Sequence, residues 1–205
     1  RNQFKVEKRF KINGKFIIGY IGRLSWYEGI DILIKSIPCV LKKIQNIILV
    51  LIGNINKDYL KYLKQLSREL NISKYILLLS AIPHREITKY YSIIDIIVLP
   101  RLNLNVSRLV TPLKPLESMA LKTLVIASDL PALRFTIKPE KTGDLFKAED
   151  PEDLASKIIY YLRNPEKRNK IEEFARDYVE KNFSWKKVVP NYRKIYDDLL
   201  KNKDF

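Results

Sequence analysis

The sequence predicts an α/β domain built on a parallel sheet flanked by helices, with a helical C-terminal tail. Short apolar runs alternate along the chain with segments whose apolar residues recur at helical spacing. Alternation of this kind is typical of a parallel sheet covered by helices, because each crossover returns the chain to the same edge of the sheet. With 205 residues the chain is long enough to bury the core of one such domain.

The first half of the chain predicts four strands, each followed by a helix or a loop. The strands are expected at 16–21, 47–52, 75–79 and 94–99, and the first two close at Gly22 and Gly53. Helices are expected at 31–44, at 58–70 and in a short segment that ends at residue 91, and a loop is expected over 100–110.

The second half predicts two more strands, at 124–127 and 142–146, with a turn at Pro131 between them. Asp150 and Pro151 are an N-cap and a first helical position, and Asn164 with Pro165 repeats the arrangement. A last helix is expected to begin at Ser184. The chain therefore ends in a helical tail.

Residues 111–120, with the sequence TPLKPLESMA, form the most informative motif. The prolines restrict the entry to a helix, and the Thr111 hydroxyl is a candidate cap. This start leaves N–H groups free around Leu113 and Lys114, where the positive end of the helix favours a diphosphate. Glu117 lies about one turn further along and can accept hydrogen bonds from hydroxyl groups.

This motif resembles the donor-binding half of the GT-B glycosyltransferases, in the large retaining family usually numbered four. That family typically reads Pro-Leu-Glu-Ala-Met-Ala and then Gly-x-Pro-Val-Val-Ala-Ser. The resemblance extends from about residue 16 to residue 200 and implies a Rossmann-like sheet. The matching residues are Pro115, Leu116, Glu117, Met119, Ala120, Val125, Ala127 and Ser128.

The resemblance implies a transferase that moves a hexosyl group from a UDP- or GDP-linked sugar to a glycan or a lipid-linked acceptor. The nucleotide-diphosphate sugar is the substrate, and no metal or other cofactor is expected. The residues implied in catalysis are Glu117, Arg23 and Lys114. The residues implied in donor binding are Gly22, Arg23, Pro83, Arg101, Thr111, Leu113, Lys114 and Glu117.

Residues 19–29, with the sequence GYIGRLSWYEG, match the family's first glycine loop, which passes close to the donor diphosphate. Arg23 stands where many members place an arginine against that diphosphate, and a planar guanidinium fork suits such a group. An ordinary surface arginine is the competing interpretation.

Two departures from the family pattern affect the predicted site. Where the family often has a lysine that neutralises phosphate, this chain has Glu28, and Arg101, Arg108 or Lys114 would have to supply the charge. The family also carries two glutamates eight positions apart, the first touching the transferred sugar and the second holding the ribose. Glu117 matches the second, but Leu109 stands at the first.

The substitution at Leu109 keeps a non-catalytic reading open. Sugar recognition would then depend on backbone amides of residues 111–113, or the domain would be a degenerate nucleotide-sugar-binding module. A nucleotide-sugar epimerase of GT-B type is a further alternative, and the 111–120 motif argues against it.

Other polar and aromatic residues receive more modest interpretations. Pro83 and His84 begin a segment where relatives bind the nucleotide base through backbone groups, and His84, the only histidine, excludes a multi-histidine metal site. Asp95 and Asp129 are expected to shape strand ends. Four tyrosines are expected to pack rather than stack on bases: Tyr90, Tyr91, Tyr160 and Tyr161.

The chain is interpreted as part of a longer protein, since it begins at an arginine. Residues 1–15 would be a basic lead-in from an N-terminal domain, 16–183 the nucleotide-sugar-binding domain, and 184–205 a helix packing toward that N-terminal domain. The acceptor site would lie in the N-terminal half, so the chain by itself is expected to be inactive.

The net charge of +15, from 38 Lys and Arg against 23 Asp and Glu, indicates either an anionic partner or a solvated, Lys-rich surface that reflects compositional bias. A nucleotide diphosphate and an anionic membrane surface both qualify, whereas no motif for specific nucleic-acid binding is found. Cys39 is the only cysteine, and no apolar run is long enough to span a bilayer. These features predict a cytoplasmic protein that attaches peripherally to the inner face of the membrane.

Overall fold

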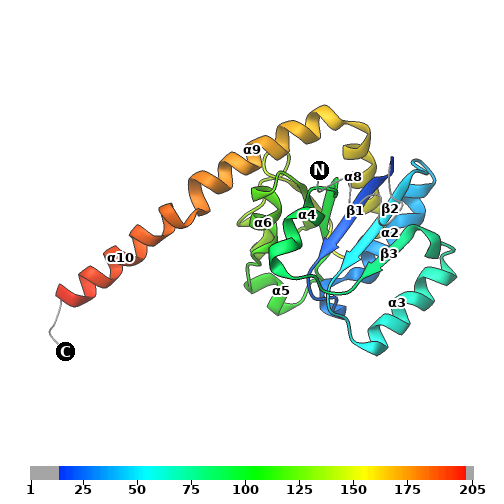
Figure 1. Ribbon diagram of the computed structural model, residues 1–205, viewed down its shortest axis with the longest axis horizontal. Coiled ribbons are helices and arrows are strands. Elements are labelled where there is room, and N and C mark those ends of the chain that lie inside the picture. The colour runs from blue at the N-terminus through cyan, green and yellow to red at the C-terminus, as the bar shows by residue number, and fades with distance from the viewer. Residues whose placement is uncertain (1–13, 202–205) are drawn as a thin grey trace.

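Six parallel strands form one sheet in residues 14–201, the part of the chain that the computed structural model describes (Figure 1). The strand order is β3-β2-β1-β4-β5-β6, which is the Rossmann order. The predicted α/β class with a parallel sheet is therefore confirmed. The strands are β1 Phe16–Ile21, β2 Ile47–Ile52, β3 Ile76–Leu79, β4 Ile96–Leu99, β5 Leu124–Ser128 and β6 Asp144–Phe146.

The chain reverses its direction across the sheet between β1 and β4. From β1 it builds outward to β3, and it then returns to place β4 on the other side of β1. Ile18 of β1 therefore pairs with Leu49 of β2 on one side and with Ile96 of β4 on the other. In open α/β sheets a crevice at the carboxyl ends of the strands beside such a reversal is the usual ligand site.

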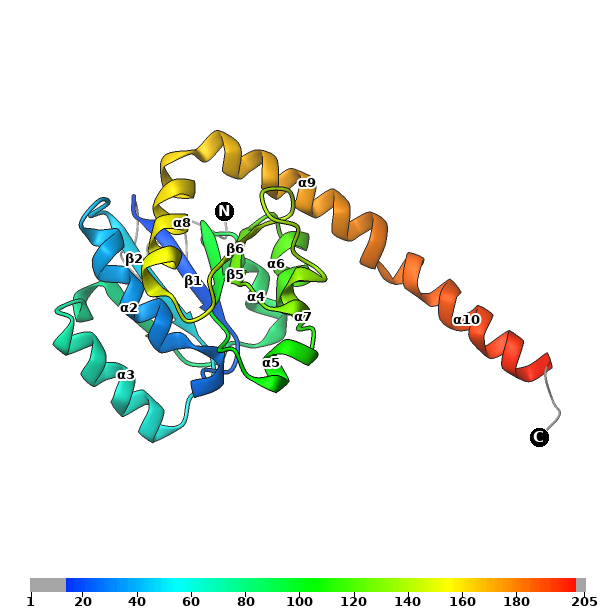
Figure 2. The same ribbon diagram turned by 180° about the vertical axis from the view of Figure 1, so that it is seen from behind.

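Helices cover both faces of the sheet. Helices α2 and α8 lie on one face, and α4 and α6 lie on the other (Figures 1 and 2). The α-helices are α2 Ile30–Leu41, α3 Lys57–Glu69, α4 Ile87–Tyr91, α5 Asn105–Leu109, α6 Lys114–Ala120, α7 Pro131–Arg134, α8 Pro151–Arg163, α9 Pro165–Phe183 and α10 Trp185–Lys201. Three short 3-10 helices are η1 Trp26–Glu28, η2 Ser73–Tyr75 and η3 His84–Glu86.

The central strands are apolar because both of their faces are covered. Every residue of β2 is buried, and β1 is buried from Ile17 to Ile21. Asp95 directly precedes β4, and its carboxylate accepts from the Ile17 N–H of the neighbouring strand β1 at 2.7 Å. Its predicted role at a strand end is confirmed.

Several predicted helix details need correction. The loop expected over 100–110 contains α5, and the turn expected at Pro131 is the short helix α7. Asp150 does cap α8 by accepting from the N–H groups of Glu152 and Asp153. Asn164 occupies the N-cap of α9, but its amide donates to the Tyr160 carbonyl instead of capping the helix.

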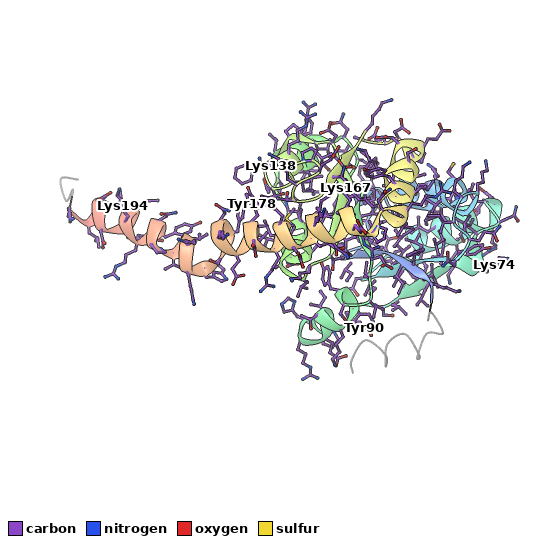
Figure 3. All side chains as sticks on the ribbon, turned by 90° about the horizontal axis from the view of Figure 1, so that it is seen from above. Lys74, Tyr90, Lys138, Lys167, Tyr178 and Lys194 are labelled. Atoms are coloured by element: carbon purple, nitrogen blue, oxygen red, sulfur yellow. The ribbon has the colours of Figure 1, made fainter. Side chains whose placement is uncertain are left out.

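Helix α10 continues beyond α9 and extends away from the sheet, so that Lys194 and Lys74 lie near opposite ends of the molecule (Figure 3). None of its residues is buried, and Trp185 is 79% exposed. The packing of 184–205 toward an N-terminal domain stays a prediction. Residues 1–13 of the predicted lead-in and 202–205 of the tail lie outside the described residues. No helix between residues 14 and 201 is both long and apolar enough to cross a membrane.

Candidate functional site

A pocket of about 580 Å³ lies at the carboxyl ends of β1, β2 and β3. Parallel strands end at one edge of the sheet, so the loops that follow them meet there. The pocket is open to solvent at Arg23, whose side chain is exposed. Its lining residues are Ile21, Gly22, Arg23, Leu24, Ser25, Ile52, Gly53, Asn54, Ile55, Asn56, Ala81, Ile82 and Ile87.

The two loops that floor the pocket are held in register by backbone hydrogen bonds. The Gly22 N–H donates to the Ile52 carbonyl and the Leu24 N–H donates to the Asn54 carbonyl, each at 2.9 Å. These bonds continue the β1–β2 pairing past the strand ends. Arg23 lies between them in sequence, so its backbone is held in place while its side chain is exposed at the pocket.

Glu28 is the centre of a buried charged cluster next to this pocket. It is only 7% exposed, and its Oε2 atom accepts from the Tyr20 hydroxyl and from the Lys114 ammonium, each at 3.0 Å. The Nε atom of Arg101 lies 3.9 Å from the other carboxylate oxygen. The cluster therefore joins β1, η1, the segment after β4 and the start of α6.

The ammonium of Lys114 lies directly over Gly22. A Cβ built on Gly22 would come within 2.9 Å of Nζ, and Nζ also donates to the Tyr20 hydroxyl at 2.6 Å. The same Nζ lies 4.6 Å from the centre of the Tyr20 ring, within the range of a cation–π contact. Lys114 thus brings a positive charge to the glycine loop from a residue far away in sequence.

The cluster changes the proton affinity of its members. Burial lowers the pKa of Lys114, the nearby Arg101 lowers it further, and the Glu28 carboxylate opposes both. Burial also raises the pKa of Tyr20, and the charge of Glu28 adds to that rise. The Tyr20 hydroxyl therefore stays protonated, and Glu28 favours the charged form of Lys114.

Arg101 is placed in the interior, with 6% of its surface exposed. Its Nη1 atom donates to the Val110 carbonyl at 3.0 Å, which closes the segment that contains α5. The residue before Arg101 packs closely against Gly29, which has φ 68°. Only glycine fits at position 29, because a Cβ there would come within 1.9 Å of the Pro100 carbonyl oxygen. Arg101 thus connects Glu28 with Val110 from the protein interior. Arg108, by contrast, is exposed on α5.

The N-cap of helix α6 lies two residues later than the sequence suggested. Leu113 occupies its N-cap position and makes no side-chain capping bond, so Thr111 is not the cap. Glu117 lies in the first turn with its side chain exposed, and Thr111 and Leu113 are exposed as well.

The structure gathers some predicted residues more closely than others. Gly22, Lys114 and Arg101 belong to one cluster beside Arg23. Pro83 is the exposed N-cap of η3 and directly follows Ile82, which lines the pocket.

Asn54 and Asn56 line the pocket and Tyr20 contacts Glu28, but the sequence analysis predicted none of the three. Asn54 and Asn56 follow the second glycine turn in the same way that Arg23 follows the first, which was a usable signal. Tyr20 lies inside the apolar strand β1, and nothing in the sequence marked it as a contact of Glu28. Between residues 14 and 201, no three His, Cys, Asp or Glu side chains are grouped so that they could hold a metal ion.

The family model described as "Glycosyl transferases group 1" matches residues 2–178 of the chain. Among curated proteins, spore coat protein SA of Bacillus subtilis (strain 168) is 25% identical over 96% of the chain and 52% of its own length. D-inositol 3-phosphate glycosyltransferase of Corynebacterium jeikeium is 27% identical over 89% of the chain and 43% of its own. The chain spans about half the length of these relatives.

Solved structures have the same fold. A glycosyltransferase from Rickettsia africae superposes with a TM-score of 0.86 at 25% identity, covering 98% of this chain and 52% of that one. The C-terminal domain of a glycosyl transferase group 1 family protein, LpcC, from Francisella tularensis gives 0.77 at 26%, covering 90% of this chain and 94% of that one. Anabaena HepE in complex with UDP and glucose gives 0.82 at 18%, with coverage of 98% and 52%.

The match over residues 2–178, the Rossmann strand order and the likeness to a separately solved C-terminal domain agree with one another. The chain belongs to the glycosyl transferases group 1 family, and it has the fold of the C-terminal domain of a GT-B glycosyltransferase.

Proposed function

We propose that this chain is the donor-binding half of a retaining glycosyltransferase that uses a UDP- or GDP-linked sugar. The observation that carries the proposal is the pocket at the ends of β1–β3, bordered by the exposed Arg23 and, over Gly22, by the Lys114 ammonium. Two cations beside an open pocket suit a diphosphate, which carries concentrated negative charge. Relatives of the same fold support it, since Anabaena HepE is solved with UDP and with UDP-glucose.

In this proposal each residue group has a separate role. Arg23 and Lys114 hold the diphosphate, together with backbone N–H groups near Leu113, and Glu117 accepts hydrogen bonds from the ribose. The segment that begins at Pro83 would meet the base through its backbone. Arg101 would affect the donor only indirectly, because its guanidinium is buried against Glu28 and Val110.

The proposed reaction is a transfer of the sugar to an acceptor hydroxyl. The bond between the anomeric carbon and the diphosphate oxygen breaks, and a bond to the acceptor oxygen forms on the same face of the sugar. The acceptor proton leaves with the diphosphate. Arg23 and Lys114 stabilise the negative charge that develops on the leaving group, and fixed charges of this kind supply much of an enzyme's rate enhancement.

The acceptor is proposed to be a glycan or a lipid-linked sugar bound by an N-terminal half of the protein. Without that half, the chain is expected to bind the donor weakly and to transfer nothing. Its net charge of +15 favours peripheral attachment to the anionic inner face of a membrane from the cytoplasm. Vesicle sedimentation with and without anionic lipid, at low and high salt, tests that attachment.

A degenerate nucleotide-sugar-binding module is the second candidate function. The observation that favours it is Leu109, which is 81% exposed on α5 and cannot form the hydrogen bonds of the glutamate that the family places there. Transfer or hydrolysis of any nucleotide-sugar by a longer protein that contains both halves would eliminate this candidate.

Calorimetric titration with UDP, GDP and ADP at moderate salt tests the proposed donor site. Saturable binding of one nucleotide is expected, weakened about tenfold or more by Arg23→Ala and by Glu117→Ala, because each removes a hydrogen bond in which one partner is charged. Arg193→Ala on α10 is the matched control, since it removes the same charge from an exposed site. Equal, salt-sensitive binding of all three nucleotides, unaffected by either substitution, would contradict the proposal.

A further inference from the structure

Lys114 uses two of its three donors inside the protein. An ammonium has three N–H groups, and the Tyr20 hydroxyl and the Glu28 carboxylate each accept one. In the described chain no further hydrogen bond is found from this ammonium. The remaining donor belongs to an ammonium that lies over Gly22, a residue that lines the pocket.

The charges around Lys114 come from every element that packs against it. Glu28 on η1 and Glu117 on α6 favour its protonated form, whereas Arg101 after β4 and burial of the side chain oppose that form. Tyr20 on β1 contributes a neutral hydroxyl and the face of its ring. Glu28 is the acidic group in direct contact with the ammonium, so it is the main support for the charge.

We propose that Glu28 is a positioning residue for the donor diphosphate, because it fixes the Lys114 ammonium over Gly22 in its charged form. The inference rests on the proposed donor site. It gives Glu28 a different role from the one its sequence position suggested, since the family resemblance led us to expect a phosphate-binding lysine there. In this chain the cation comes instead from α6, and the residue at position 28 anchors it.

The cluster keeps a net positive charge with Glu28 in place. One carboxylate faces the two cations of Lys114 and Arg101, so one positive charge remains for an anionic ligand. A free lysine side chain would lose rotamer entropy on binding phosphate, whereas this one is already held by two hydrogen bonds. Without the carboxylate, the half-buried Lys114 ammonium would face the buried Arg101 guanidinium without the charge of Glu28, and the pKa of Lys114 would fall further.

The test is the pH dependence of nucleotide binding. UDP and GDP are titrated into the 205-residue chain and into Glu28→Gln between pH 6 and pH 9, and thermal unfolding verifies that each variant is folded. The variant is expected to bind about tenfold more weakly at pH 9, with a smaller deficit at pH 6, because loss of the carboxylate lowers the pKa of Lys114 and a lower pH favours its charged form. A deficit that is the same at every pH would overturn the proposal.

A double-mutant cycle separates positioning from a general structural role. If Glu28 acts through Lys114, then Glu28→Gln has no further effect on affinity in a Lys114→Met background. Equal losses in both backgrounds would overturn the proposal. Lys114→Met alone decides the question if Glu28→Gln fails to fold, because unchanged affinity in that variant leaves Glu28 nothing to position.

Asp144→Asn is the matched control for loss of a buried carboxylate. Asp144 is 3% exposed and accepts from Lys157 at 2.9 Å and from the Tyr161 hydroxyl at 3.0 Å, in a second cluster on β6 and α8. It should cost stability without changing nucleotide affinity. If the unsubstituted chain shows no saturable binding at all, the proposed donor site itself fails. If that chain binds and Glu28→Gln is equivalent to it, only the role of Glu28 fails.

Discussion

Gly53 lies against the backbone carbonyl of Gly22 so closely that a Cβ on residue 53 would come within 1.7 Å of that oxygen. The two glycines close β1 and β2, and both line the pocket. The contact is made by backbone on both sides, so no side chain can move to relieve it. The floor of the pocket therefore requires a residue without a Cβ atom at position 53.

Gly53→Ala is expected to destabilise the fold by about 3 kcal/mol or more, because the added methyl group must displace backbone. Chemical denaturation followed by circular dichroism measures the change in the free energy of unfolding. Gly14→Ala is the control, since Gly14 also has a positive φ of 73° but a Cβ there meets no atom of residues 14–201 within 4 Å. Equal losses in the two variants would show that backbone strain, not the contact with Gly22, is the cause.

A second prediction concerns alkaline pH and Tyr91. Burial raises the pKa of Tyr91 to about 12, whereas an unfolded tyrosine ionises near 10. Above pH 10 the unfolded chain loses this proton first, so the folded state binds more protons and its stability falls as pH rises from 10 to 12. The contribution is fully present below pH 10.

Unfolding free energies at pH 8, 10 and 11 test this, with Tyr91→Phe compared against the unsubstituted chain. The fall between pH 10 and pH 11 should be shallower in Tyr91→Phe. Tyr192→Phe on the exposed face of α10 is the control and should leave the slope unchanged. Parallel slopes in all three proteins would refute the prediction.

The sequence predicted the sheet well because its signals are local. The runs at 16–21 and 47–52 are apolar throughout and end at glycines, and they became β1 and β2 without a shift of either boundary. Helices α5 and α7 were missed because helices of five and four residues are too short to display a helical period. Thr111 was misassigned as a cap because a hydroxyl before a proline indicates a helix start without fixing its first residue.

The candidate site was harder to predict because its chemistry joins distant segments. Glu28 and Lys114 are 86 residues apart, and their contact follows from the packing of the glycine loop against the start of α6. From sequence alone, Glu28 indicated only that the expected lysine is absent at this position. The fold is needed to show that the Lys114 ammonium lies beside Glu28.

A third prediction concerns the cap of α3. The Asn56 side chain accepts from the Tyr59 N–H at 2.7 Å, so Asn56→Ala should cost about 1 kcal/mol of stability. Asn105→Ala is the control, because Asn105 is an exposed asparagine at the first position of α5, where the N-cap is Leu104. Denaturant midpoints compare the two, and an equal or larger loss in Asn105→Ala would contradict the assignment.

The last prediction is that α10 adds little to the stability of the domain. No residue of α10 is buried, whereas α9 buries Ile171, Ala175 and Val179 and donates from Arg176 to the Ala120 carbonyl at the end of α6. A chain that ends at Phe183 should therefore melt within about 2 °C of the 205-residue chain, because surface residues contribute little. A chain that ends at Asn164 should melt far lower, since it also lacks α9. Differential scanning calorimetry of the three chains distinguishes the cases. A drop of more than about 5 °C on removing α10 alone would mean that its apolar face is covered within this chain, and would argue against its reserve for an N-terminal domain.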